Sequence, residues 1–108
     1  MKEVNSFIQT LRSKKTRESY KNHIEAFCEF KNIKTLDDFK NMTCDDFYEY
    51  KNYLIEEKNN SENSLKPKFV ALSSFYNYLI ADGKYGVVEN VIKRNNITKG
   101  IKPMVNPA

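Results

Sequence analysis

Residues 65–83 read LKPKFVALSSFYNYLIADG, and this stretch decides the fold. Its large apolar residues follow one another at steps of four, three, four and three: Leu65, Phe69, Leu72, Tyr76 and Leu79. Such spacing places side chains on one face of a helix. Lys66 and Lys68 lie near the beginning of the stretch and off that face. The pattern predicts a helix whose body belongs to the core and whose N-terminal end meets an anion.

Both ends of this helix carry sequence signals. Gly83 supplies the stop, because glycine accepts the left-handed backbone conformation that closes a helix. The start lies near Ser61 or Ser64, and either serine can act as a cap. Pro67 favours Ser64, since a proline is tolerated in the first turn, where its missing N–H is not needed.

Three more apolar stripes of helical period precede this stretch. We expect helices at about residues 3–11, 16–31 and 43–55, with Thr16 capping the second and Thr43 the third. Asp46 follows Thr43 by three residues, which resembles a capping box. The inward residues are Val4, Phe7, Ile8 and Leu11, then Tyr20, Ile24 and Phe27, then Phe47, Tyr50 and Leu54. A short turn at residues 36–39 and a shorter helix at about 87–94 complete an all-α fold.

Length and composition indicate one small helical domain. The chain has 108 residues, with three Gly and three Pro, and so few of these residues argue against an all-β chain. A run of about 18 apolar residues is absent, so we expect no membrane span, and the N-terminus lacks the apolar core of a signal peptide. Cys28 and Cys44 have no Cys or His at metal-ligand spacing, which favours free thiols in a reducing, cytoplasmic compartment.

The net charge of +4 is unevenly distributed along the chain. Residues 1–27 hold six basic and three acidic residues, residues 28–60 hold five and eight, and residues 61–108 hold seven and three. This basic, acidic, basic pattern suggests two basic segments on one surface, which would favour nucleic acid or another polyanion. Ordinary solvated helix faces are the alternative.

The end of the chain differs in character from the rest. Residues 97–108 have no helical period, and they combine lysines with Pro103 and Pro107. Such a composition is typical of a connector between domains. We therefore expect a helical domain at residues 1–96, followed at residues 97–108 by a linker toward a C-terminal domain that this chain lacks.

The order of these motifs resembles a known family. The run TRESY at residues 16–20, followed by Ile24 and Phe27, looks like the start of the core-binding domain of tyrosine recombinases, the phage-integrase family. Residues 64–79 with Gly83 resemble the last long helix of that domain, and residues 47–54 stand where the family has an intervening helix. The likeness covers about residues 3–95. One departure is Asn90-Val91, where family members often carry Asn-Pro.

This resemblance implies a compact four-helix orthogonal bundle of the SAM-like type, with a short additional C-terminal helix. It also implies a DNA-binding part rather than an enzyme. The family's catalytic Arg, Lys, His-x-x-Arg pair and Tyr nucleophile lie on a later domain, and the only histidine here, His23, is not followed by an arginine at the third position.

A DNA clamp needs cations and hydrogen-bond donors directed at phosphates. The first candidate cluster, at the entry to the second helix, is Lys14, Lys15, Thr16, Arg17, Tyr20 and Lys21. The second, at the entry to the fourth helix, is Asn63, Ser64, Lys66 and Lys68, and Lys84 could continue the contact along the backbone. The resemblance implies that both helix entries face DNA and approach its major groove.

Several of these residues have a purely structural interpretation. Thr16 and Ser64 could be caps alone, Lys14 and Lys15 a solvated loop, and Tyr20 a core residue with its hydroxyl at the edge. We interpret His23 as a surface residue of its helix. The acidic pairs at residues 37–38 and 45–46 are expected to mark helix starts rather than a metal site, and we expect no metal and no cofactor.

The sequence thus favours a DNA-binding domain of a site-specific recombinase or integrase, with double-stranded DNA and other recombinase protomers as partners. The isolated domain is expected to be a monomer. The alternative is a small helical protein-interaction module that uses the acidic residues 45–57 or Tyr48 and Tyr53. A self-contained enzyme is disfavoured, because the chain shows no nucleophile–base pair and no Gly-rich phosphate loop.

Overall fold

All the regular structure in the described part of the chain is helical. The computed structural model describes residues 1–94 and 97, and for Glu62 it describes the backbone alone. Its elements are α1 (Lys2–Gln9), α2 (Lys14–Phe30), α3 (Leu36–Lys40), α4 (Cys44–Glu56), α5 (Glu62–Asp82) and α6 (Val91–Arg94). The all-α prediction is confirmed. None of the described helices is long and apolar enough to cross a membrane.

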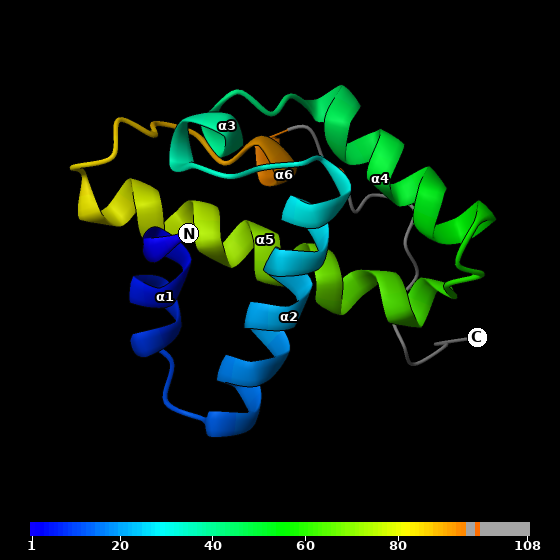
Figure 1. The fold of residues 1–108 in the computed structure, drawn as a ribbon, viewed down its shortest axis with the longest axis horizontal. Helices are drawn as coiled ribbons and strands as arrows, with labels where there is room; N and C mark the ends of the chain where they lie inside the picture. Colours follow the sequence, from blue (N-terminus) through cyan, green and yellow to red (C-terminus); the bar gives the residue numbers. More distant parts are fainter. Residues whose placement is uncertain (95–96, 98–108) are drawn as a thin grey trace.

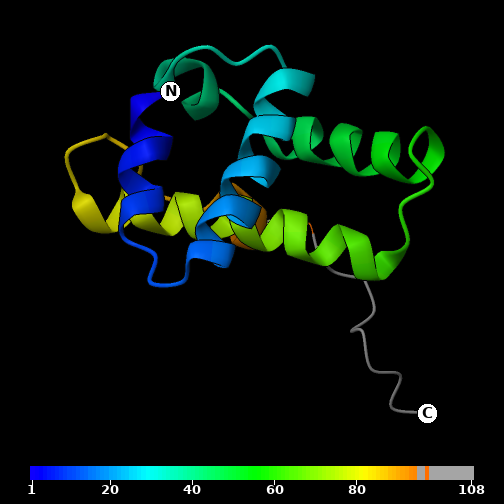
Figure 2. The same cartoon turned by 60° about the horizontal axis from the view of Figure 1, so that its bottom comes forward.

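The helices are arranged around α5, the longest of them. Figures 1 and 2 show α2 crossing α5 near its middle, with α1 beside the C-terminal half of α5 and α4 beside its N-terminal half. Residues Leu65, Phe69, Leu72, Tyr76 and Leu79 are all buried, as the stripe predicts. Ala71 and Phe75 are fully buried too, so α5 is covered over more than one face. This central position fits the helix that carries the densest apolar sequence.

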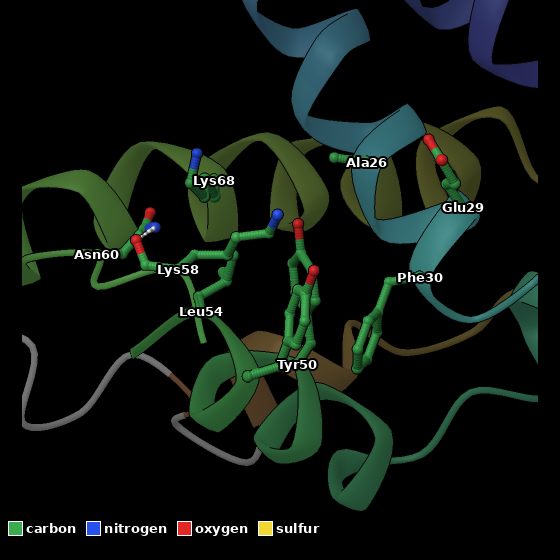
Figure 3. A pocket seen from close by; sticks show the side chains of 9 residues that line it. Ala26, Glu29, Phe30, Tyr50, Leu54, Lys58, Asn60 and Lys68 are labelled. Atoms are coloured by element: carbon green, nitrogen blue, oxygen red, sulfur yellow. Dashed lines mark hydrogen bonds between the residues drawn. The ribbon is translucent and has the colours of Figure 1, made fainter. Parts of the chain in front are cut away.

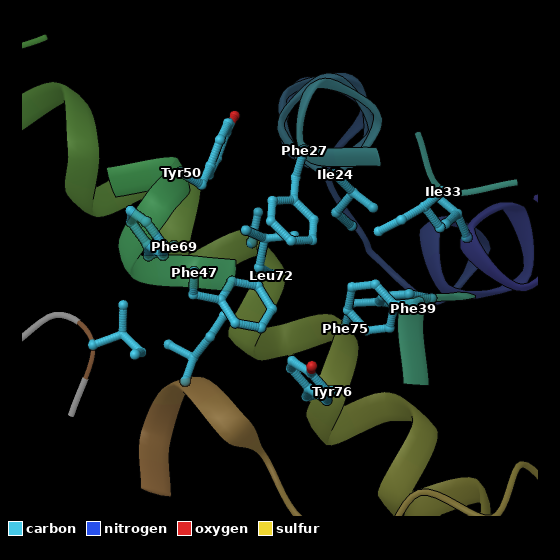
Figure 4. Packing of buried hydrophobic residues seen from close by; sticks show 14 of the residues in the cluster. Ile24, Phe27, Ile33, Phe39, Phe47, Tyr50, Phe69, Leu72, Phe75 and Tyr76 are labelled. Atoms are coloured by element: carbon cyan, nitrogen blue, oxygen red, sulfur yellow. The ribbon is translucent and has the colours of Figure 1, made fainter. Parts of the chain in front are cut away.

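A cluster of aromatic rings joins the helices across the core. Phe27 of α2 is fully buried, and its ring stacks on Phe47 of α4 with 4.7 Å between centroids. Phe39 of α3 meets Phe27 edge-on at 6.3 Å and lies 5.1 Å from Phe75 of α5. Figure 4 shows these rings converging between α2, α4 and α5. Each such pair adds about 0.5–1.5 kcal/mol to the stabilisation that burial provides.

Two helices begin three residues earlier than predicted. The cap of α2 is Ser13, whose hydroxyl oxygen accepts from the Thr16 N–H at 3.3 Å. The cap of α5 is Ser61, which accepts in the same way from the Ser64 N–H at 3.3 Å. Thr16 and Ser64 are therefore the capped residues and not the caps. The prediction was wrong because a serine or threonine in the first turn has the same sequence signature as a cap.

The earlier start places Pro67 in the second turn of α5, inside the helix. A proline there removes the N–H that would bond the carbonyl group of Asn63. The cost is local and is offset by the burial of Leu65 and Phe69 on either side. The bond from the Ser64 N–H to the Ser61 hydroxyl therefore identifies the start of the helix, in spite of the position of the proline.

The other helix ends are set by local signals. Asp46 accepts from the Thr43 N–H at 2.8 Å, so the predicted capping arrangement is confirmed. Gly83 closes α5 with φ +80°, also as predicted. The predicted turn at residues 36–39 is α3, whose cap is Thr35. In contrast, α1 ends at Gln9 instead of Leu11, and α6 covers only Val91–Arg94 instead of 87–94.

Asn90 attaches the last described segment to α5. Its side-chain amide donates to the Ser73 carbonyl at 3.0 Å, to the Ser73 hydroxyl at 2.8 Å and to Asn77 Oδ1 at 3.1 Å. Its own oxygen accepts from the Lys93 N–H at 3.1 Å and so caps α6. Beyond α6, Ile97 is fully buried against the core. Most of the predicted linker, residues 98–108, lies outside the described residues.

Candidate nucleic-acid interface

The crossing of α2 over α5 brings one residue of the second predicted cluster, Lys68, beside α2. Burial, followed by the positive charge of Lys68, lowers the pKa of His23. Lys68 also lines one groove together with Ala26 of α2, which places the second turn of α5 beside the C-terminal half of α2. His23 is half-buried, and its Nε2 lies 3.2 Å from the Ser19 hydroxyl.

His23 was not predicted as part of the site, and its partial exposure agrees with its interpretation as a surface residue of its helix. It belongs to a face of α2 that also carries Thr16, Ser19 and Ala26, at steps of three, four and three. These side chains are small or polar, and all of them keep some exposure to solvent. The spacing was a signal in the sequence, but only the position of α5 shows that this face borders Lys68.

The first predicted cluster divides into exposed cations and structural residues. Lys14, Lys15 and Lys21 are exposed on α2 and form no ion pair with a described side chain. Thr16 and Tyr20 are half-buried, and the Tyr20 ring stacks on Phe7 of α1 with 6.3 Å between centroids. The three lysines are thus available to an anion.

Arg17 has a role within the fold. Its Nη1 donates to the carbonyl of Leu11 at 2.6 Å and to that of Arg12 at 3.1 Å. These bonds attach the α1–α2 connection to the first turn of α2. Charged hydrogen bonds of this kind contribute about 1.5–3 kcal/mol each when a partner is removed.

Replacing Arg17 by alanine should therefore reduce stability by about 2–3 kcal/mol. The loss arises because two carbonyl groups are left without their donor. Thermal unfolding followed by circular dichroism measures it, with Arg12→Ala, an exposed arginine of the same connection, as the matched control. An unchanged midpoint for Arg17→Ala would show that the two bonds contribute nothing to the fold.

The second predicted cluster lies in the first two turns of α5. Asn63, Ser64 and Lys66 are exposed and Lys68 is half-buried. The Ser61 hydroxyl lies 3.3 Å from Ser64 Oγ, so Ser64 is engaged in the cap. Lys66 and Lys68 form no ion pair with any side chain that the structure describes.

Lys84 does not join either cluster. It follows Gly83 at the C-terminal end of α5, and a helix of 21 residues is about 30 Å long. Its Nζ lies 4.0 Å from the Asp82 carboxylate and 5.3 Å from the centre of the Tyr85 ring. Figures 1 and 2 also place the first turns of α2 and α5 apart from each other, and Lys68 borders α2 near Ala26, beyond the first cluster.

The described residues offer little for other chemistry. They contain no group of three or more His, Cys, Asp or Glu side chains that could hold a metal ion. Cys28 and Cys44 are half-buried free thiols, and burial raises the pKa of Cys28 to about 11. Its thiol is therefore protonated and weakly nucleophilic at neutral pH.

The comparison with protein families supplies the decisive observation. Residues 2–83 match the family model described as phage integrase, N-terminal SAM-like domain. The chain belongs to this family. A search of curated proteins and a search of solved structures each found no match.

The match places both predicted clusters within the SAM-like domain. It begins at the first residue of α1 and ends at Gly83, so it includes α2 and the whole of α5. Lys84 lies just beyond it. The resemblance to the integrase and recombinase family is confirmed, and the matched part is the N-terminal SAM-like domain and not the catalytic one.

Proposed function

We propose that this SAM-like domain binds double-stranded DNA as the clamping part of a site-specific tyrosine recombinase or integrase. The single observation that supports the proposal best is that Lys68 of α5 lines one groove with Ala26 of α2 within a domain of this family. It joins the basic entry of α5 to the polar face of α2. Catalysis and assembly with other protomers would depend on parts of the protein beyond this domain, and the domain alone would be a monomer.

The available charges suit a phosphate backbone. Lys14, Lys15, Lys21 and Lys66 are exposed, and none forms an ion pair with a side chain that the structure describes. Each lysine that neutralises a phosphate releases a counterion, so the affinity should fall steeply with salt. The face of α2 that carries Ser19 and His23 lies between these cations and Lys68, where it would meet base edges.

Lys15→Ala and Lys66→Ala test the proposal, because each removes one exposed lysine from a different helix. We expect each variant to bind duplex DNA more weakly whatever the sequence. When the salt concentration rises fourfold, the affinity of each variant should also fall less than that of the parent, by a factor of about 3.5. Fluorescence anisotropy titrations at several salt concentrations measure both effects.

Lys34→Ala is the matched control, since Lys34 is exposed in the α2–α3 connection, away from α5. It removes the same charge and should leave the salt dependence unchanged. If Lys15→Ala and Lys66→Ala behave like Lys34→Ala, the DNA surface is not where we place it.

A protein-interaction module is the competing function, and one observation favours it. Tyr48 and Ile55 on the acidic helix α4 are 40% and 42% exposed, and their spacing of seven residues places them on the same face of that helix. A module of this kind should show no affinity for duplex DNA. The salt titration of the parent domain therefore separates the two functions.

A further inference from the structure

A groove between α2, α4 and α5 lies next to the proposed DNA surface and was not predicted. Its volume is about 610 Å³. Phe30, Tyr50 and Tyr53 form one wall, Lys58 and Lys68 lie at one end, and Glu29 lies on the side of α2 (Figure 3). Lys58, which follows α4, is not one of the predicted DNA-binding residues.

The aromatic wall is rigidly packed. The Phe30 ring lies 4.5 Å from that of Tyr53 and 5.1 Å from that of Tyr50. Burial raises the pKa of Tyr50 to about 12, so its hydroxyl keeps its proton at neutral pH. That hydroxyl forms no hydrogen bond with the residues that the structure describes, and Figure 3 shows it pointing to the same end of the groove as Lys58. The Tyr50 hydroxyl is therefore available as a hydrogen-bond donor at the Lys58 end of the groove.

Two ammonium groups from different elements accompany this donor. Lys58 Nζ lies 6.0 Å from the centre of the Tyr53 ring, and Lys68 of α5 lines the same groove. Neither lysine forms an ion pair within the described part of the chain. Two unpaired ammonium groups and a phenol hydroxyl match the charge and the acceptor oxygens of a phosphate group.

The position of the groove along α2 suggests which phosphate this is. Lys15 and Ala26, a lining residue of the groove, are eleven positions apart, or about 17 Å along a helix. The major groove of DNA is about 12 Å wide. The start of α2 and the part of α2 that borders the groove are thus far enough apart to approach the two backbones on either side of one major groove.

We propose that this groove holds a backbone phosphate of the bound duplex through Lys58, Lys68 and the Tyr50 hydroxyl. The proposal rests on the DNA-binding function proposed above and extends its surface to α4. Glu29 is exposed on the opposite side, where its carboxylate repels the backbone and limits the affinity.

Three variants test this assignment in the same anisotropy titration. Lys58→Ala should weaken binding at low salt. When the salt concentration rises fourfold, the affinity of this variant should fall less than that of the parent, by a factor of about 3.5. Tyr50→Phe removes one hydroxyl without changing the charge, so it should weaken binding at an unchanged salt slope. Glu29→Gln should bind roughly two- to threefold tighter at low salt, with the gain fading as salt rises. Circular dichroism confirms that each variant is folded.

The outcomes separate this proposal from the one it rests on. If Lys58→Ala behaves like Lys34→Ala while Lys66→Ala still reduces the salt slope, the groove proposal is overturned and the DNA-binding function stands. If neither Lys58→Ala nor Lys66→Ala alters the salt slope, both proposals fail. A Tyr50→Phe variant that binds as tightly as the parent while Lys58→Ala weakens binding would exclude the hydroxyl as a donor and overturn the three-group site.

Discussion

Replacing Phe27 by alanine is expected to destabilise the domain by about 3–5 kcal/mol. The Phe27 ring is fully buried and meets Phe47, Phe39 and Tyr50, which come from two other helices. The substitution removes these contacts and leaves a cavity that rigid neighbouring rings cannot fill. For a domain of this size the melting temperature should fall by more than about 12 °C.

Thermal and urea-induced unfolding followed by circular dichroism measure this loss. Val88→Ala is the control, because Val88 is 88% exposed and its side chain contributes little burial. Phe27→Leu, which retains more of the buried volume, should fall between the parent and Phe27→Ala. A Phe27→Ala variant as stable as the Val88→Ala control would mean that the aromatic cluster is not the centre of the core.

Asn90→Ala should have the second largest effect, a loss of about 2–3 kcal/mol. Asn90 is only 7% exposed, and it donates to Ser73 and Asn77 of α5 while accepting from the Lys93 N–H. Alanine leaves these partners unsatisfied in a partly buried site. The effect should be concentrated in α6, so hydrogen exchange of the amides at residues 92–94 should accelerate more than that of α5.

Asn90→Asp distinguishes two roles of this side chain. Aspartate caps a helix as well as asparagine does, but it cannot donate to the Ser73 carbonyl. If donation to α5 is what holds the segment, Asn90→Asp should be destabilised like Asn90→Ala. If Asn90→Asp keeps the stability of the parent, capping alone is important, and the attachment to α5 described above is wrong. Asn52→Ala, at an exposed amide on α4, serves as the control.

The apolar pattern was sufficient to predict most of the fold. The stripes of the four long helices are the residues that form the core, from Val4 and Phe7 in α1 to Leu79 in α5. Helical period depends on nearest neighbours along the chain, so a pattern of this length identifies the buried face without knowledge of the partner helix. The resemblance of the chain to the integrase domain follows from the same pattern.

Helix starts were predicted less well. Ser13 and Thr16, and likewise Ser61 and Ser64, are pairs of possible caps separated by three residues. Because a cap bonds the N–H of the third residue beyond it, the two members of such a pair cannot be told apart locally. Pro67 pointed to the later member, whereas the bond from the Ser64 N–H to the Ser61 hydroxyl shows that the earlier one is the cap.

The candidate site depends on tertiary structure more than the fold does. The sequence showed that lysines gather at the entries of two helices, but it treated Lys84 as a continuation of them and left out Lys58 and His23. The structure places Lys84 at the far end of α5 and Lys58 in a groove shared with Lys68. Arg17, in turn, bonds two backbone carbonyl groups of the α1–α2 connection.

By itself, the sequence determined the helical class, the buried faces, the stop at Gly83 and the family, because these depend on spacing along a single chain. Only the tertiary structure decided which cations share a surface. Charges interact through space, so their neighbours depend on how the helices are packed. The angle at which α2 crosses α5 is set by the fit of the Phe27 cluster against Leu72 and Phe75, and a local sequence pattern does not contain this fit.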